Sequence, residues 1–391
     1  MKQIIVVGDN SSTNLGDPIL TQSTFYIIKR LVDDRDYKVS IFDIADRKTQ
    51  AFKVTTSLES ISSIKQSSYI VFIFKNLFVD IKAIVKWFIK DKRLFIKRLE
   101  KCIHEEKIKF VIAGGALISS SLFYALRLNA IINVAKRHNG QVIFNAIGIE
   151  KTIYNYGFAK YIVRHFLKQP QVVSFSTRDH VEDISYLTNR KEFQIQSPDS
   201  GIFAAEAFDV CLKKTDLIGL SVISYQAYES VMLNDERIRN LTPENLFSFW
   251  EGILRNFIST GQNFKIFTNG GVKDYEMGLL LCKRMKLDPT QYLLPMATNP
   301  KQLVKQFSLF RFVIAHRLHA LIISTSLGIP VVPIVWSDKV VSFAKMIDNP
   351  YAQYPSFDNN ISQLVNTVSF DNNILYSLQK KIIAYLQKSI L

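Results

Sequence analysis

Short β-rich runs alternate with helical patterns along almost the whole chain of 391 residues, and this alternation constrains the fold more than any other feature. Strands separated by helices form parallel sheets with crossover helices. The first series of expected strands is Gln3–Val7, Lys38–Phe42, Tyr69–Phe74, Phe110–Ala113, Val142–Ala146 and Val172–Ser176. The second series is Leu217–Val222, Phe264–Phe267, Phe312–Ala315 and Val331–Val335.

The break between the two series is expected near Ser197–Lys214, where Ser-Pro-Asp-Ser-Gly interrupts regular structure. A chain of this length is long enough for two domains of ordinary size. We therefore expect an α/β protein with two Rossmann-like domains facing each other across a cleft, over residues 1–200 and 201–391. The last helix, near Asn372–Lys388, is a candidate to cross back onto the first domain.

The composition is that of a soluble globular protein, with 48% hydrophobic and 21% charged residues. No run approaches the roughly 18 unbroken apolar residues that a membrane span requires. Met1–Asp9 has the pattern of a first strand and lacks the apolar region and cleavage site of a signal peptide. We therefore expect a cytoplasmic location.

Cysteine and histidine spacing argues against a metal site. Cys102, Cys211 and Cys282 are far apart, and the six histidines show no HExxH spacing. We expect no metal and no cofactor. The net charge of +15 favours an anionic partner. No nucleic-acid-binding motif is present, so we expect no nucleic-acid partner. A phosphorylated substrate or an anionic membrane surface explains the charge as well, and charge alone does not choose between them.

The loops after the strands deserve most weight, because open parallel sheets bind ligands beyond the carboxyl ends of their strands. The first such loop ends in Asn14-Leu15-Gly16-Asp17-Pro18, with Asp17 expected at the N-cap of a helix and Pro18 at its first position. It is neither a GxGxxG nor a Walker A loop. Asn14, Gly16 and Asp17 would suit a hydroxyl-rich ligand, and a plain capped turn is the alternative.

Glycines and one arginine follow the later strands of the first series. Gly114-Gly115 would let the backbone approach a ligand or a neighbouring strand, and Gly148 follows the next strand. Arg178 lies at a strand end, where its guanidinium could bind an anion in bidentate fashion. The alternatives are tight packing for the glycines and a surface ion pair with Asp179 or Glu182 for the arginine.

The most informative loop is His316-Arg317-Leu318-His319, between an expected strand and a helix. A helix N-terminus already favours an anion through its free N–H groups and its dipole. A guanidinium and an imidazole there suit a carboxylate or a phosphate. Ser337 and Lys339 follow the next strand and should lie on the same side of the sheet.

Taken together, these loops resemble the polysaccharide pyruvyltransferase family. The matching elements occur in the family's order along nearly the whole chain: Asn14-Leu15-Gly16-Asp17, Gly114-Gly115, Gly148, Arg178-Asp179, Pro198-Asp199, Arg317-Leu318-His319 and Gly328-Ile329-Pro330 with Lys339 beyond. The sequence departs from the family pattern at Ala116, Glu182 and Trp336, where the family often has glycine, serine and tyrosine.

The resemblance implies a fold like that of the GT-B glycosyltransferases, with phosphoenolpyruvate as donor. The acceptor would be a sugar of a capsule, an exopolysaccharide or a lipid-linked precursor, with the first domain on the acceptor side and the second on the donor side. The resemblance implies catalytic roles for His319 and Arg317. We expect a catalytic role for Asp17 as well. The substrate-binding candidates are Arg178, Asn14, Gly16, Gly114, Gly115, His316, Ser337 and Lys339.

The expected reaction fits these side chains. Arginines and a helix N-terminus can hold the carboxylate and phosphate of the donor. The imidazole of His319, with an ordinary pKa near roughly 6.5, can transfer protons near neutral pH. A nucleotide-sugar glycosyltransferase of the same fold and a non-catalytic polysaccharide-assembly protein are the alternatives.

The segment Lys75–Lys101 has nine Lys or Arg against three Asp or Glu. Its apolar residues recur at helical spacing: Phe78, Ile81, Val85, Phe88, Phe95 and Leu99. A second stripe is basic: Lys82, Lys86, Lys90, Lys97 and Lys101. The pattern fits a crossover helix with a solvated basic face, or a helix that holds the protein on the inner, anionic face of the membrane. Exposure of Trp87, Ile89, Leu94 and Ile96 would make the two interpretations compatible.

Overall fold

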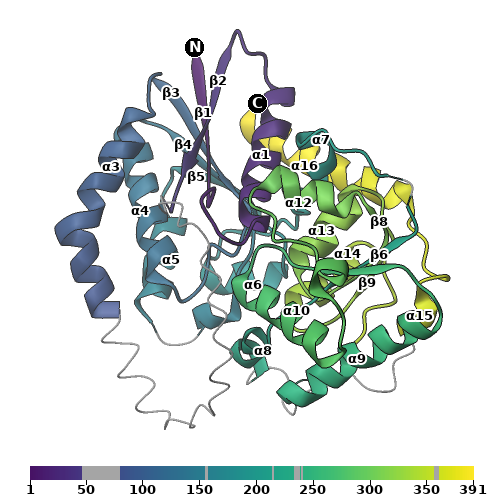
Figure 1. Ribbon diagram of the computed structural model, residues 1–391. Helices are drawn as coiled ribbons and strands as arrows, with labels where there is room; N and C mark the ends of the chain where they lie inside the picture. The colour runs from purple at the N-terminus through teal and green to yellow at the C-terminus, as the bar shows by residue number, and fades with distance from the viewer. Residues whose placement is uncertain (46–79, 155–156, 214, 233–237, 239–240, 356–360) are drawn as a thin grey trace. The chain divides into compact units, whose positions relative to one another are not determined.

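The computed structural model describes residues 1–45, 80–154, 157–213, 215–232, 238, 241–355 and 361–391 (Figure 1). The chain divides into two compact units. The first unit comprises Met1–Ser11, Ile28–Ser197 and Leu386–Leu391, and the second comprises Ser12–Ile27 and Pro198–Tyr385. The expected strand Tyr69–Phe74 lies outside the described residues.

The first unit is built on a five-stranded parallel sheet with strand order β2-β1-β3-β4-β5. Its strands are β1 (Lys2–Gly8), β2 (Tyr37–Asp43), β3 (Lys107–Ala113), β4 (Gln141–Ile147) and β5 (Val172–Thr177). The helices are η1 (Trp87–Asp91), α3 (Lys92–Lys101), α4 (Leu122–Arg137), η2 (Lys151–Tyr154), α5 (Phe158–Leu167), α6 (Val181–Leu187) and η3 (Lys191–Phe193). Helix α1 (Gly16–Leu31) spans the division between the units.

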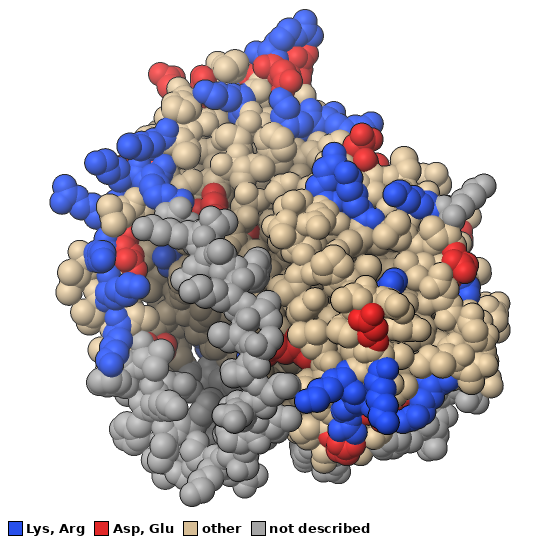
Figure 2. All heavy atoms as spheres, viewed as in Figure 1, with Lys and Arg blue, Asp and Glu red and all other residues tan. Residues whose placement is uncertain are grey.

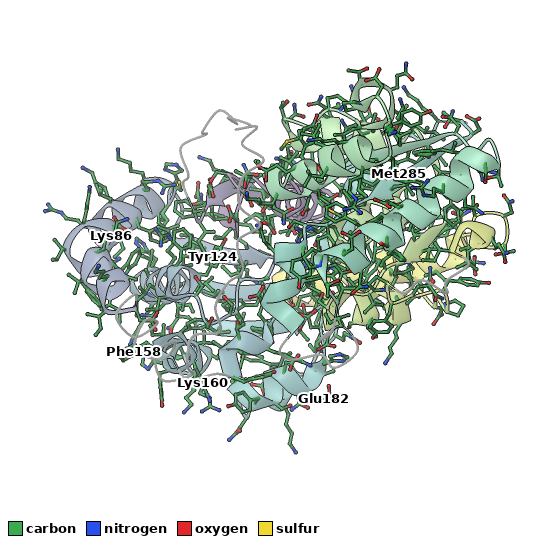
Figure 3. All side chains as sticks on the ribbon, turned by 60° about the horizontal axis from the view of Figure 1, so that its bottom comes forward. Lys86, Tyr124, Phe158, Lys160, Glu182 and Met285 are labelled. Carbon is green, nitrogen blue, oxygen red and sulfur yellow. The ribbon has the colours of Figure 1, made fainter. Side chains whose placement is uncertain are left out.

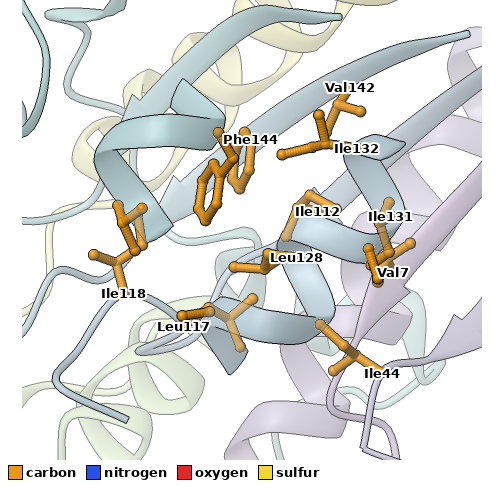
Figure 4. Packing of buried hydrophobic residues seen from close by; sticks show 14 of the residues in the cluster. Val7, Ile44, Ile112, Leu117, Ile118, Leu128, Ile131, Ile132, Val142 and Phe144 are labelled. Carbon is orange, nitrogen blue, oxygen red and sulfur yellow. The ribbon is translucent and has the colours of Figure 1, made fainter. Parts of the chain in front are cut away.

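Side chains of the sheet and of α4 form the core of the first unit (Figure 4). Ile112 of β3 and Phe144 of β4 are wholly buried with Leu128 and Ile131 of α4. Strands of parallel sheets are covered on both faces, so they appear in the sequence as continuous apolar runs. This is why the β-rich runs could be recognised.

The second unit contains a four-stranded parallel sheet with strand order β7-β6-β8-β9. Its strands are β6 (Leu217–Ser221), β7 (Phe264–Phe267), β8 (Phe310–Ala315) and β9 (Val331–Pro333). The helices are η4 (Ser200–Phe203), α7 (Ala204–Ala207), α8 (Tyr225–Met232), α9 (Pro243–Ser259), α10 (Val272–Arg284), α11 (Pro289–Tyr292), α12 (Pro300–Phe307), α13 (Leu318–Ser326), α14 (Asp338–Met346) and α15 (Ile361–Leu364). Helix α16 (Asn372–Ile390) spans the division between the units.

The predicted α/β class with two parallel sheets is confirmed. The chain passes between the units at Ser197 and Pro198, but Ser12–Ile27 belongs to the second unit instead of the first. The backbone N–H of Leu15 donates to the carbonyl of Asn269 at 3.1 Å, which attaches this segment to the loop after β7. At the other end, Leu386–Leu391 belongs to the first unit, where Lys109 Nζ donates to the carbonyl of Ile390 at 2.6 Å.

The basic segment forms a helix over the described residues 80–101, interrupted by the π-helical turn η1; Lys75 and Phe78 lie outside the described residues. A π-turn places one extra residue in the helix and so rotates everything after it. The predicted apolar stripe is therefore divided: Phe95 and Leu99 are buried, whereas Phe88 is exposed. The prediction of one continuous apolar face was wrong for this reason. No helix among the described residues is long and apolar enough to cross a membrane.

Candidate functional site

His319 lies at the start of α13, with Arg317 at the N-cap position, and three predicted residues surround its ring. Its Nδ1 is 3.5 Å from Asn14 Nδ2, and its Nε2 is 3.9 Å from Asp17 Oδ1. A Cβ atom on Gly16 would lie only 1.9 Å from His319 Nδ1, so the absence of a side chain there makes room for the ring. The structure thus brings together His319, Asn14, Gly16 and Asp17 within the second unit.

The loop that carries these residues is fixed by its own hydrogen bonds. Asp17 Oδ2 accepts from the Ser12 hydroxyl at 2.9 Å, and Asn14 Oδ1 accepts from the backbone N–H of Gly16 at 3.4 Å. Helix α1 therefore begins at Gly16, and Asp17 lies in its first turn. The expected N-cap role of Asp17 was wrong, because the helix begins one residue earlier, at Gly16. Asp17 thus points its second carboxylate oxygen toward His319.

A turn of the β7 loop supports the same segment. Gly270 has a φ of +101°, a conformation that side chains rarely adopt. A Cβ atom at Gly270 would lie 2.7 Å from the carbonyl oxygen of Thr13. Together with the Leu15–Asn269 hydrogen bond, this close approach sets the position of Asn14 and Asp17 relative to His319.

Arg317 is held by a carboxylate that the sequence analysis did not single out. Its Nε and Nη2 donate to the two oxygens of Asp274 at 2.7 and 2.8 Å, and Asp274 is 2% exposed. The backbone N–H of Ser224 also donates to Asp274, at 2.9 Å. A guanidinium has five N–H donors, so this pairing fixes its plane and leaves other N–H groups for an anion.

Two cations lie over the ring of Trp336. The guanidinium carbon of Arg317 is 5.3 Å from the centroid of the Trp336 ring, and Lys339 Nζ is 5.1 Å from it. Cations are attracted to the face of an indole ring. The predicted substrate-binding residue Lys339 and Arg317 thus contact the same aromatic side chain.

His316 is wholly buried between the rings of Tyr228, Phe249 and Trp250, with centroids 5.5, 6.1 and 5.2 Å away. Burial, and to a smaller extent the positive charge of the adjacent Arg317, lower its pKa to about 3. The imidazole is therefore neutral at ordinary pH. Its predicted role in substrate binding stays a prediction.

Several buried polar atoms near the carboxyl ends of the second sheet have no hydrogen-bond partner among the described residues. They belong to Thr268 and Asn269 after β7, and to Trp336 and Ser337 after β9. Leaving such a group unsatisfied costs about 1–3 kcal/mol, so native proteins usually satisfy it, with protein groups or with bound molecules. Hydroxyl, amide and indole N–H donors at this edge suit a ligand rich in oxygen.

In the first unit, Arg178 is buried against two glycines. A Cβ atom on Gly148 would lie 2.9 Å from Arg178 Nη2 and 3.1 Å from the carbonyl of Gly115. Gly115 itself has a φ of +83°, and Gly114 donates its N–H to the carbonyl of Asn145 at 3.0 Å. With 7% of Arg178 exposed, the alternative of a surface residue does not apply. The structure thus places Arg178 and Gly115 on either side of Gly148.

Three residues near this site, Asp274, Asn269 and Gly270, were not predicted from the sequence. The run Thr268-Asn269-Gly270-Gly271 directly after β7 is a polar loop with paired glycines, and the same rule that selected Gly114-Gly115 applies to it. Asp274 carried no such signal, because it resembles any acidic residue in the first turn of a helix. Among the residues that the structure describes, no group of three or more His, Cys, Asp or Glu could hold a metal ion.

Two parallel α/β units with basic and polar side chains at their strand ends define a protein of the GT-B fold class. The chain is similar to a solved structure of S. aureus MnaA with UDP, at 8% identity over 100% of this chain and 95% of that one, with a TM-score of 0.51. That likeness confirms the predicted fold. A putative UDP-N-acetylglucosamine 2-epimerase from Listeria monocytogenes is also similar, at 7% identity, 99% and 90% coverage and a TM-score of 0.49.

The family comparison is more specific. Residues 224–338 match the family described as polysaccharide pyruvyl transferase. The matched segment contains Asp274, Arg317, His319 and Trp336, and it confirms the predicted resemblance over this part of the second unit. Over this segment the chain is similar to a family of transferases, which indicates an enzyme. No curated protein matches its sequence.

Proposed function

We propose that the protein transfers a pyruvyl group from phosphoenolpyruvate to two hydroxyls of a sugar, forming a cyclic ketal and releasing phosphate. The acceptor is a sugar of a cell-surface polysaccharide or of its lipid-linked precursor. The observation that carries the proposal is the position of His319, between Asp17 and Asn14 at the N-terminus of α13 and two residues from Arg317.

The reaction requires balanced proton transfers. One sugar hydroxyl adds to C2 of the enol and loses its proton, while the methylene carbon gains a proton and becomes a methyl group. The second hydroxyl then attacks C2 and loses its proton as the C2–O bond to phosphate breaks. His319 is proposed as the group that moves a proton, because an imidazole both accepts and donates near neutral pH. Asp17 is proposed to orient the ring and to stabilise its protonated form.

Donor binding is assigned to the basic side chains. Arg317 keeps N–H groups that Asp274 does not use, and these are proposed to bind a carboxylate or phosphate oxygen together with Lys339. The helix N-terminus adds favourable dipoles for the same charge. Arg178 of the first unit keeps its proposed role in substrate binding, with Gly114 and Gly115 as proposed backbone contacts to a substrate.

The decisive experiment incubates the purified protein with phosphoenolpyruvate and candidate lipid-linked glycans. Phosphate release and the mass of the product glycan are then measured together. We expect His319→Ala to lower kcat about 10²–10⁴-fold and Arg317→Ala chiefly to raise the KM for phosphoenolpyruvate. The exposed residues His104 and Arg255 provide matched controls, since His104→Ala and Arg255→Ala remove the same groups elsewhere.

The outcomes separate the alternatives. Full activity of His319→Ala would leave the histidine as a structural residue at a helix end. Stabilisation by a uridine nucleotide in a thermal-shift assay, without any effect of phosphoenolpyruvate, would favour a nucleotide-sugar glycosyltransferase. Absence of binding to every donor, with retained binding to polysaccharide-assembly proteins, would favour a non-catalytic role.

A further inference from the structure

A group of large apolar side chains is exposed on the helices of the first unit. On the helix 80–101 they are Ile81, Val85, Phe88, Ile89 and Leu94, and on α5 they are Phe158 and Tyr161. Their exposed fractions run from 42% for Phe158 to 80% for Ile89. We call these seven residues the apolar face. Scattered exposed hydrophobic residues are ordinary, whereas a contiguous group of them marks an interaction surface.

The π-turn explains why these residues face outward while their helix still packs on the unit. Trp87 of η1 is buried beside Phe95 of α3, with the ring centroids 5.7 Å apart, and Phe95 in turn contacts Phe42 of β2 at 5.5 Å. These contacts attach the helix to the sheet. Phe88 and Ile89 follow Trp87 directly and therefore point to other sides of the helix, away from the core.

The two helices of the apolar face meet at their first residues. The Asp80 carboxylate accepts a hydrogen bond from the backbone N–H of Phe158, the first residue of α5. The start of the helix 80–101 is therefore next to the start of α5. In Figure 3 the labelled residues Lys86 and Phe158 lie along the same margin of the first unit. The apolar side chains of both helices thus contribute to one surface.

Basic side chains accompany the apolar face. Between residues 80 and 101 there are eight Lys or Arg against three Asp or Glu. Lys82, Lys86 and Lys90 are exposed on the same helical stretch as Ile81, Val85 and Ile89. Lys92 Nζ lies 4.9 Å from the ring centroid of Phe88. In Figure 2, Lys and Arg line the margin of the molecule where Figure 1 places α3.

The combination of exposed apolar and basic side chains distinguishes among the candidate partners. A second copy of the chain would bring the same positive charges together, which like-charge repulsion opposes. A nucleic acid would use the cations and stacking aromatic rings but would gain little from exposed Ile, Val and Leu side chains. An anionic lipid surface uses both features, because apolar side chains enter the acyl boundary while lysines bind the headgroups.

We propose that the apolar face, with Lys82, Lys86 and Lys90, binds the first unit to an anionic membrane surface. Helix α5 follows β4 and begins on the side of the carboxyl ends of the strands, where Gly148 and Arg178 also lie. Binding through this face would place the strand-end loops of the first unit near the lipid. A lipid-linked acceptor sugar would then be held at the membrane within reach of these loops. The membrane binding itself does not depend on the proposed reaction.

Vesicle co-sedimentation of the full chain tests the proposal without any substrate. Vesicles of phosphatidylcholine alone are compared with an equal mixture of phosphatidylcholine and phosphatidylglycerol. Each cation near an anionic surface contributes about fivefold to affinity, so Lys82→Gln, Lys86→Gln and Lys90→Gln together should weaken binding to the mixed vesicles about a hundredfold. Phe88→Ser with Ile89→Ser should weaken it at least about tenfold through lost apolar burial.

The chain offers matched controls in the second unit. Lys301→Gln, Lys305→Gln and Lys380→Gln remove three exposed charges, and Tyr376→Ser removes an exposed ring. We expect these variants to bind mixed vesicles like the unmodified protein. Equal binding to both kinds of vesicle, or unchanged binding of either set of variants in the apolar face, would overturn the proposal. Because no donor is added, a failed transferase assay would not affect this result.

Discussion

Gly16→Ala tests whether the geometry around His319 matters for catalysis. A Cβ atom at residue 16 would lie 1.9 Å from His319 Nδ1, whereas ordinary contacts of a Cβ atom begin at 3.4 Å. The ring would have to move by the difference, 3.4 − 1.9 = 1.5 Å. A misplacement of about 1 Å in a catalytic constellation can cost about 10²-fold in rate. We therefore expect kcat to fall about a hundredfold.

The same substitution should leave the fold intact. Gly16 is the first residue of α1 and its φ is not positive, so alanine fits its backbone. Alanine is the better helix former by up to about 1 kcal/mol. Gly252→Ala is the matched control, because Gly252 lies within α9 and a Cβ atom there would meet nothing within 4 Å. The Gly252→Ala variant should keep full activity, and its free energy of unfolding should rise by an amount similar to that of Gly16→Ala.

A double-mutant cycle makes the test sharper. Steady-state phosphate release would be measured for Gly16→Ala, His319→Ala and the double variant, with thermal unfolding measured in parallel. If alanine acts only by displacing the imidazole, it should have almost no further effect once the ring is removed. Full activity of Gly16→Ala, or a hundredfold loss that persists in the His319→Ala background, would refute the reasoning.

Three further outcomes follow from the structure. Asp274→Asn should raise the KM for phosphoenolpyruvate. It should also lower the free energy of unfolding by about 1.5–3 kcal/mol, the usual contribution of hydrogen bonds to a charged group. Steady-state kinetics and urea unfolding measure these two effects, and an unchanged KM would show that Asp274 does not act in donor binding. His316→Phe should flatten the loss of stability in acid. The buried imidazole, with its pKa lowered from 6.5 to about 3, binds its proton more readily in the unfolded chain. Its contribution is complete above pH 6.5 and declines as pH falls from 6.5 toward 3, by up to about 1.4 kcal/mol per pH unit. Melting curves across this range check the sign, and equal slopes for both proteins would contradict it. Activity should survive treatment with a chelator, and its specific recovery with one divalent ion would show that a metal is needed.

The sequence was a good guide wherever structure follows from local patterns. The strand Phe264–Phe267 was predicted with the bounds that the structure shows. Several other strands extend one to three residues beyond the apolar runs, because exposed residues such as Lys2 and Lys107 still pair in the sheet, whereas β6 and β9 end earlier than expected. The helix 80–101 was predicted as a helix, but its faces were not, since the π-turn depends on packing of Trp87 and Phe95 against the sheet.

In the candidate site, too, the features that follow from local sequence could be predicted and those that depend on distant contacts could not. Arg317 and His319 could be selected from the sequence because they follow a strand and open a helix, where anion binding has a general physical cause. Asp274 could not be selected, because its role depends on a contact with a residue 43 positions away. Asn14 lies 305 positions from His319 along the chain, and their proximity depends on how the first loop packs on the β7 loop.

The sequence by itself determined the alternation of strands and helices, the two sheets and the loops at which polar residues gather, because backbone geometry and apolar periodicity are local properties. Only the tertiary structure decided that residues 12–27 belong to the second unit, that Gly16 makes room for the His319 ring, and that Phe88 and Ile89 face outward. These features depend on which distant surfaces pack together. Packing is set by the shapes of many side chains at once, and no short stretch of sequence contains that information.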